Sequence, residues 1–169
     1  MTTPEAAAIR EVFRRNMFCV VATATPTGEP WLSPVFFNYS PDFRLFWESA
    51  HDAQHSQNLR LNPRVAIFVK DTAAHGPATD LYIAASALEV PPERLAGALD
   101  AWWNGPHGHS DRAKREVSDY GPSKPLRLYE ASIQALFVLS ETVVDDYRVD
   151  TRVEVDMALL SEDATRHPQ

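Results

Sequence analysis

Uncharged hydrogen-bonding side chains gather in one short segment of this chain, between residues 49 and 58. Ser49, Gln54, Ser56 and Asn58 fall within these ten residues, and His55 lies among them. The segment has the pattern of a strand end, a polar turn and a short helix that is stopped by proline. The first backbone N–H groups of a helix have no partner within it, so they attract anions. The pattern predicts an anion site, and neutral donors bind a phosphate less tightly than Arg or Lys.

The same segment carries two histidines one helical turn apart, His51 and His55. Such a pair can share a metal ion, as in the H-E-x-x-H motif. Here Asp52, one methylene shorter than glutamate, stands in the second position, and no strong third ligand follows at short range. We therefore expect no metal site. The other interpretation of the segment is a helix start capped by polar residues without any ligand.

Short strands separated by turns make up most of the chain. A first helix begins at the Thr-Pro-Glu of residues 3–5 and ends near Asn16. Runs of β-branched and aromatic residues then predict strands, and Gly, Pro and Asp mark the turns between them. The first three strands are expected to form an antiparallel meander. The predicted strands cover residues 17–25, 31–39, 44–49, 64–70, 81–90, 127–139 and 148–155.

A second helix and a long irregular segment precede the last two strands. The helix begins at the Pro-Pro-Glu of residues 91–93. We expect Trp102 in the core and Trp103 half exposed. Residues 104–125 contain three glycines and two histidines, which predicts a long loop with a helical turn near residues 111–117; loops of this length often act as lids. Residues 161–169 are polar, and we expect them to be disordered.

Length and composition indicate one ordinary globular domain. The chain has 169 residues, of which 44% are hydrophobic and 23% charged. A net charge of −7 argues against nucleic-acid binding, which needs clustered positive charge. The single cysteine, Cys19, lies in an apolar run, which predicts buried packing rather than redox chemistry. Without an apolar run of about 18 residues or a signal-peptide pattern, we expect a cytoplasmic protein that does not enter a membrane.

The order of the elements favours a mainly β (α+β) fold. Short strands joined by turns, with helices between only some of them, are typical of a closed or split β-barrel. The chain shows no βαβ alternation and no Gly-x-Gly-x-x-Gly motif, which argues against a dinucleotide-binding parallel sheet. It also has no Gly-x-Ser-x-Gly motif, and no Ser, His and Asp stand out as a triad.

Residues 46–69 resemble the flavin-binding split-barrel family related to pyridoxamine 5′-phosphate oxidase. In that family a strand ending in Ser or Thr leads to a phosphate-binding loop, an Asn-Leu helix and a strand of NPRVA type. Here Ser49, Asn58-Leu59 and the NPRVA of residues 62–66 take these places. The resemblance implies an antiparallel split β-barrel of about six strands with peripheral helices. It implies one FMN-binding domain over residues 1–160, and a homodimer with the flavin between the protomers.

Carried over position by position, the resemblance implies a cofactor site on two strands and the following helix. The implied residues are Ser33, Pro34, Val35 and Phe36 beside the ring and ribityl chain, Trp47, Glu48 and Ser49 at the strand end, and Gln54, His55, Ser56 and Asn58 near the phosphate. Many family members carry Arg and Lys where this chain has Gln54 and His55. The site is therefore either weaker or completed by Arg60, Arg64 or a residue of the partner chain.

The resemblance implies an FMN-binding oxidoreductase acting on a small molecule, in which the flavin supplies the redox chemistry. It does not extend to pyridoxamine 5′-phosphate oxidase itself, because the Arg-x-His substrate motif and the Arg-Leu-x-Pro ending do not occur. One alternative is a deazaflavin-dependent reductase. The other is a non-catalytic flavin- or haem-binding dimeric module, for which His75, His107 and His109 are the candidate loop ligands. No residue stands out as catalytic, and we expect residues 104–125 to cover the ring as a lid.

Overall fold

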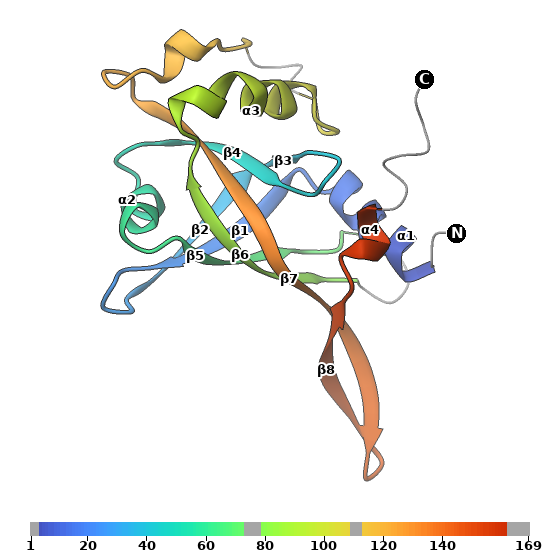
Figure 1. Ribbon diagram of the computed structural model, residues 1–169. Helices are drawn as coiled ribbons and strands as arrows, with labels where there is room; N and C mark the ends of the chain where they lie inside the picture. The colour runs from blue at the N-terminus through green and yellow to red at the C-terminus, as the bar shows by residue number, and fades with distance from the viewer. Residues whose placement is uncertain (1–3, 73–78, 109–112, 162–169) are drawn as a thin grey trace, which may run out of the picture.

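The computed structural model describes residues 4–72, 79–108 and 113–161, and these form a curled antiparallel sheet with helices at its periphery (Figure 1). The expected mainly antiparallel, barrel-like α+β fold is confirmed, with eight strands instead of about six. The strands are β1 (Phe18–Ala24), β2 (Pro30–Phe36), β3 (Asn38–Tyr39), β4 (Leu45–Ala50), β5 (Arg64–Val69), β6 (Leu81–Glu89), β7 (Leu126–Val144) and β8 (Tyr147–Val155). Their order in the sheet is β2-β1-β5-β6-β7-β4-β3, and β8 pairs with β7.

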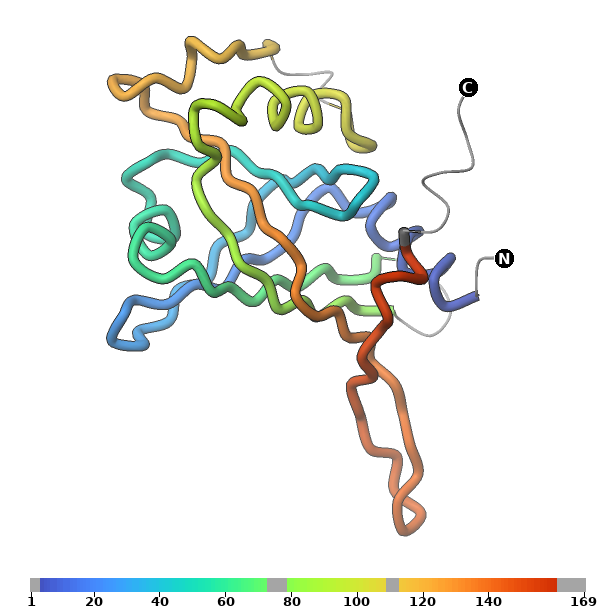
Figure 2. The backbone as a smooth tube through the Cα atoms, viewed as in Figure 1, coloured from blue at the N-terminus to red at the C-terminus, as the bar shows by residue number. Residues whose placement is uncertain are grey.

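The helices lie around this sheet. They are α1 (Pro4–Arg15), α2 (Gln54–Leu61), α3 (Pro92–Asn104), the 3-10 helix η1 (Val117–Tyr120) and α4 (Ala158–Ser161). The first and last helices lie next to each other (Figure 2), and Arg10 of α1 donates hydrogen bonds to the carbonyls of Leu159 and Leu160 at 3.2 and 2.7 Å. None of the described helices is long and apolar enough to cross a membrane.

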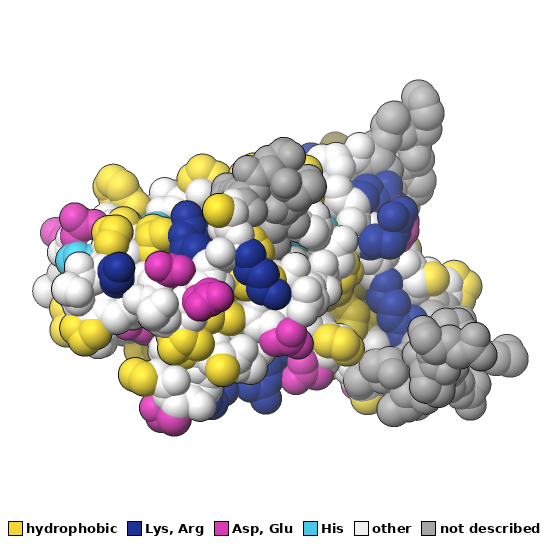
Figure 3. Space-filling model, turned by 90° about the horizontal axis from the view of Figure 1, so that it is seen from above, with side chains coloured by type: hydrophobic (Ala, Val, Ile, Leu, Met, Phe, Trp, Pro, Cys, Tyr) yellow, Lys and Arg dark blue, Asp and Glu magenta, His cyan; other side chains and the backbone are white. Residues whose placement is uncertain are grey.

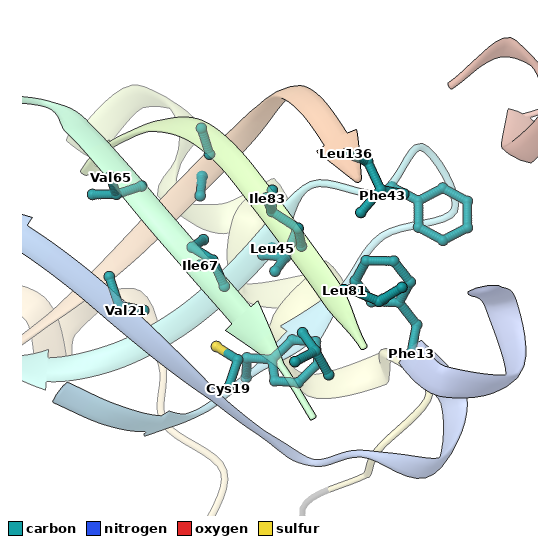
Figure 4. Close-up of a cluster of buried hydrophobic side chains, with 14 of the residues drawn as sticks. Phe13, Cys19, Val21, Phe43, Leu45, Val65, Ile67, Leu81, Ile83 and Leu136 are labelled. Carbon is teal, nitrogen blue, oxygen red and sulfur yellow. The ribbon is translucent and has the colours of Figure 1, made fainter. Parts of the chain in front are cut away.

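Alternation along the strands produces the main core. On β1, Cys19 and Val21 are buried, whereas Val20 between them is partly exposed. Figure 4 shows side chains of β1, β5 and β6 meeting inside the barrel, among them Val21, Ile67 and Ile83. Burial raises the pKa of the Cys19 thiol to about 12. The cysteine is therefore a packing residue, as predicted, and its thiolate is scarce at neutral pH.

A second apolar cluster lies between α3 and the outer side of the barrel. Trp102 and Trp103 are both buried in it, so the expected half-exposed position of Trp103 is wrong. The cluster comprises Phe46, Val90, Leu95, Ala98, Leu99, Trp102, Trp103, Tyr120 and Leu128. Seen from the α3 side, positive and negative side chains are interspersed among hydrophobic ones (Figure 3).

Two predicted elements differ from the structure. The strand expected over residues 31–39 is interrupted at Phe37, whose amide still bonds to the Met17 carbonyl at 3.0 Å. After Phe37 the chain leaves β1, and β3 pairs with β4, so the expected three-strand meander is split. β4 continues the sheet by pairing with β7. The helical turn expected near residues 111–117 lies instead at Val117–Tyr120; residues 109–112 are outside the described part.

Candidate functional site

The junction of β4 and α2 has the geometry expected of an anion site. Ala53 is the N-cap residue of α2, and its side chain makes no capping hydrogen bond. The first backbone bond of the helix runs from the Gln57 amide to the Ala53 carbonyl at 2.9 Å. The amides of residues 54–56 come before this bond, so they have no acceptor within the helix. The helix dipole adds partial positive charge at the same place.

Arg60 adds a full positive charge at this junction. Its Nη1 donates to the carbonyl of His51, in the turn before α2, at 2.8 Å. Arg64, the other cation considered from the sequence, is exposed at the start of β5. Of the two, Arg60 is therefore the one that the structure places at the turn between β4 and α2.

His55 points into the end of the barrel. Its Nδ1 lies 3.0 Å from Ser33 Oγ of β2, and its Nε2 lies 2.7 Å from Ser49 Oγ of β4. Burial lowers the pKa of His55, so the ring is neutral at pH 7, with one donor and one acceptor nitrogen. One serine hydroxyl therefore donates to the ring and the other accepts from it. Three residues that the sequence suggested separately thus form one bridge that ties α2 to two strands.

Asn58 and Ser56 also face inward. Asn58 Nδ2 donates to Thr23 Oγ1 at 3.0 Å, and Gln54 Nε2 donates to Asn58 Oδ1 at 2.9 Å. The Ser56 side chain is fully buried. Of the four residues predicted near a phosphate, only Gln54 is exposed. An anion at this junction would therefore meet backbone amides, Gln54 and Arg60 rather than the side chains of His55, Ser56 and Asn58.

The four residues predicted beside the ring alternate between the two sides of β2. Ser33 and Val35 are buried toward the interior, whereas Pro34 is exposed. Phe36 is half-buried and contacts Trp102 of α3 edge-on, with 5.6 Å between ring centroids. A ligand outside the barrel would therefore meet Pro34 and Phe36.

The neighbouring positions on β4 divide in the same way. Trp47 is fully buried and stacks on Tyr129 with 5.8 Å between ring centroids. Glu48 lies on the opposite side of the strand, where Arg115 Nη1 is 2.5 Å from its Oε2 and the Tyr120 hydroxyl donates to its Oε1. Burial and this carboxylate together raise the pKa of Tyr120. Glu48 therefore holds part of the predicted lid against the barrel.

Sequence reasoning missed Arg115 and Tyr120 as partners of Glu48. They are 67 and 72 residues from it along the chain, and no local pattern links them. It also gave no sign of the aromatic surroundings of His107. In the structure His107 is partly buried, with its ring 5.2 Å from that of Phe37 and 5.5 Å from that of Tyr39.

The outer side of β1, β5 and β6 forms an apolar surface. Val20 and Ala22 of β1 lie beside Phe68 and Ala66 of β5, and the apolar side chains continue onto β6. A hollow of about 270 Å³ opens here, lined by Val20, Ala22, Leu32, Ala66, Ile67, Phe68, Tyr82, Ile83, Ala84 and Phe137. The sequence could have indicated this apolar surface, because strands that are apolar at consecutive positions usually bury both of their faces. We name these outer sides of β1, β2, β5 and β6 the sheet face.

Within the described ranges, no three His, Cys, Asp or Glu side chains gather closely enough to hold a metal ion. His51 is exposed while His55 is buried, so this pair does not converge on one point. His75 and His109, two of the three candidate haem ligands, lie outside the described residues.

Comparison with known proteins identifies the family. Residues 6–114 match the family model named pyridoxamine 5′-phosphate oxidase, which is more than half of the chain. The protein therefore belongs to the pyridoxamine 5′-phosphate oxidase family, as the residues around the β4–α2 junction suggested. None of the curated proteins gives a significant sequence match.

Several solved structures share the fold. A haem-binding protein of Mycobacterium smegmatis superposes with a TM-score of 0.68 and 17% identity, over 95% of this chain and 61% of that one. The protein Atu2129 of Agrobacterium tumefaciens gives 0.63 and 18%, over 89% and 63%. An FAD-binding protein of Mesorhizobium loti gives 0.57 and 20%, over 75% and 88%. The chain thus spans less than two thirds of the first two proteins, and at these identities the likeness shows the fold alone.

Proposed function

We propose that this protein is a homodimeric FMN-binding oxidoreductase that acts on a small molecule, with the flavin phosphate at the β4–α2 junction. The observation that carries the proposal is the start of α2, where uncapped amides follow the turn of residues 51–53 after β4 and Arg60 supplies positive charge. Backbone amides at a helix start, a neutral donor and one cation form a suitable donor set for a phosphate.

The residues fit a flavin in part. The amides of residues 54–56, Gln54 and Arg60 would hold the phosphate, and Pro34 and Phe36 would contact the ring from outside the barrel. His55, Ser33 and Ser49 would keep α2 in place on β2 and β4, since they already bond to one another. A bound flavin would supply the electron transfer, and the chain would orient the substrate and exclude water.

The sheet face supports a homodimer. It is apolar across β1, β2, β5 and β6, and it includes exposed Phe18 and Leu32. A continuous exposed apolar surface that spans several strands is typical of an interaction site. A second copy of the chain would cover the face, and interfaces of obligate dimers commonly bury more than about 2,000 Å².

Haem is the second candidate ligand, in a non-catalytic module. The hollow in the sheet face suits a flat apolar macrocycle, since apolar side chains account for nearly all of its lining. One similar structure is a haem-binding protein. This candidate shares the fold and the dimer with the first, so the ligand itself must decide between them.

The absorption spectrum of the purified protein should show flavin bands. After removal of the ligand, titration with FMN should restore them with one FMN per protomer. Mass spectrometry of the extracted ligand separates FMN from a deazaflavin. A haem spectrum would favour the second candidate, and failure to bind FMN or haem would remove both.

Replacing Gln54 with glutamate should weaken FMN binding by about tenfold, because a carboxylate at the helix start repels the phosphate. The matched control is Leu61→Glu, which adds the same charge to an exposed position at the other end of the same helix. Fluorescence quenching of FMN measures both dissociation constants, and thermal melting checks the fold. Equal weakening by the two variants would show that the phosphate does not lie at the start of α2.

A further inference from the structure

A second hollow lies where the sheet face meets the end of α1. Its volume is about 400 Å³, which is in the range of small-molecule pockets. Its lining comes from the end of α1, from β1, β2 and β5, and from the residues just after β5. Val20 and Phe68 also line the hollow already described, so the two adjoin. None of the residues considered for the phosphate lines the second hollow, which is therefore separate from the β4–α2 junction.

The floor of the second hollow is apolar. The register pairs Val20 of β1 with Pro34 of β2 and with Phe68 of β5, so these three residues form one row across the sheet. Two large apolar side chains beside this row, Met17 and Phe18, are 48% and 60% exposed. A flat apolar body on the row would cover them and remove their surface from water.

The rim of the second hollow is cationic. Arg15 and Lys70 line it, whereas none of the described Asp or Glu residues does. Lys70 Nζ donates to the two carboxylate oxygens of Asp80 at 3.1 and 2.9 Å, and Arg15 Nη1 lies 3.4 Å from Asp71 Oδ1, while its Nε donates to the Glu11 carbonyl at 3.3 Å. An ammonium has three donors and a guanidinium five, more than these contacts use. Since the acids already offset much of the positive charge, a singly charged anion suits the rim better than a doubly charged phosphate.

Hydrogen bonds hold this rim together. Asn16, directly after α1, is buried, and its Nδ2 donates to the Val12 carbonyl at 2.7 Å. Thr72 Oγ1, just beyond β5, donates to Asn16 Oδ1 at 2.9 Å. These bonds join the end of α1 to the end of β5, so Arg15 and Lys70 are brought together before any ligand arrives. A rim that is preformed in this way loses less conformational entropy when it binds.

We propose that the second hollow binds the small molecule on which the oxidoreductase acts, and that this molecule has a flat apolar body with a carboxylate at one end. The assignment as a substrate rests on the proposed function, because Pro34 lines the hollow and is also expected to contact the flavin ring. Phe18 lies edge-on to Phe36, the other residue expected beside the ring, with 5.7 Å between ring centroids. The apolar body would lie on the floor, and the carboxylate would meet Arg15 and Lys70 in charge-assisted hydrogen bonds.

Naphthoate, a flat apolar carboxylate, should bind to the FMN-loaded protein about tenfold more tightly than naphthylmethanol, which has the same body without the charge. Isothermal titration calorimetry measures both affinities. Lys70→Gln should weaken naphthoate binding about fivefold and leave naphthylmethanol unchanged; water screens part of the charge, since the Lys70 side chain is 61% exposed. The matched control is Arg64→Gln, which removes an exposed charge at the other end of β5 and should stay within about twofold. Equal affinities of the two probes, or equal effects of the two variants, overturn the proposal.

The absorption spectrum of bound FMN tests whether the ligand lies beside the ring. Saturating naphthoate should shift the flavin bands, because an aromatic body against the ring changes its surroundings. Lys70→Gln should give the same final shift at a higher naphthoate concentration. Binding without any shift would show that the hollow does not hold the substrate. A protein that binds naphthoate through Lys70 but binds no FMN would refute the proposed function and retain the anion-binding hollow, whereas one that binds FMN and not naphthoate would refute only this inference.

Discussion

Replacing Gly105 with alanine should lower the free energy of unfolding by about 3–5 kcal/mol, a large fraction of a typical domain's stability. Gly105 ends α3 with a φ of −66°, so its backbone does not itself require glycine. The requirement is space, because a Cβ here would lie 2.2 Å from both Cγ and Oδ1 of Asn38.

Hydrogen bonds hold the Asn38 side chain in place. It is fully buried, donates to the Trp102 carbonyl at 2.9 Å and accepts from the Tyr39 amide at 3.0 Å. Displacing the side chain would leave buried polar groups without partners, and each costs about 1–3 kcal/mol. Urea unfolding followed by tryptophan fluorescence measures the loss.

Two further variants make this test specific. Gly97 lies on the exposed side of α3, and nothing lies within 4 Å of a Cβ built on it. Gly97→Ala should therefore stabilise the protein by about 0.5–1 kcal/mol. Adding Asn38→Ala to Gly105→Ala removes the clash, so the pair should cost less than the sum of the two single changes. Additive costs would show that the two residues are not in contact.

Replacing Arg115 with alanine should cost about 2–3 kcal/mol, because it leaves the carboxylate of Glu48 buried, with the Tyr120 hydroxyl as its side-chain donor among the described residues. Breaking a buried ion pair costs about 3–5 kcal/mol. We expect a smaller cost for Arg115→Ala than this general figure, because the pair is only partly buried: the Arg115 side chain is 34% exposed, while that of Glu48 is 5% exposed. Glu48→Gln should cost less, since it removes the charge and keeps the shape. Arg14→Ala, which breaks an exposed pair with Glu11, should cost less than about 0.5 kcal/mol.

The same network predicts an alkaline effect. The folded pKa of Tyr120 is raised, first by burial and then by Glu48. The stability that its neutral form contributes is complete below the unfolded value of about 10 and is lost as the pH rises above it. Tyr120→Phe should therefore reduce the fall in stability above that pH. An unchanged slope would mean that Tyr120 titrates normally in the folded protein.

The Arg115 variant also tests the lid. Hydrogen exchange of residues 113–121 should be faster in Arg115→Ala, while the amides of β1 and β5 remain protected. Tyr120 is part of the second apolar cluster, and Asn38 contacts the first residue after α3. Both ends of the predicted lid are therefore attached to the barrel, which the sequence did not indicate.

Local patterns in the sequence determined the element types. Runs of β-branched and aromatic residues in 17–25 and 64–70 predicted strands that the structure confirms, because the preference of such side chains for extended backbone is local. Proline at the helix starts and Pro63 at the end of α2 indicated the helix boundaries, because proline restricts the backbone whatever surrounds it. The order of residues around Ser49, Asn58 and Pro63 was enough to indicate the family, since that junction is continuous in the chain.

Only the tertiary structure decided which polar groups face a ligand and which bond to one another. His55 and Ser49 are close in sequence, but Ser33 reaches His55 from a different strand. Glu48 meets Arg115, and Asn38 meets Gly105, across separations that carry no periodic signal. The alternation in residues 148–155 predicted a strand, but only the register showed that it pairs with β7 outside the barrel. Such contacts depend on how the sheet closes, and that closure is set by all the strands together.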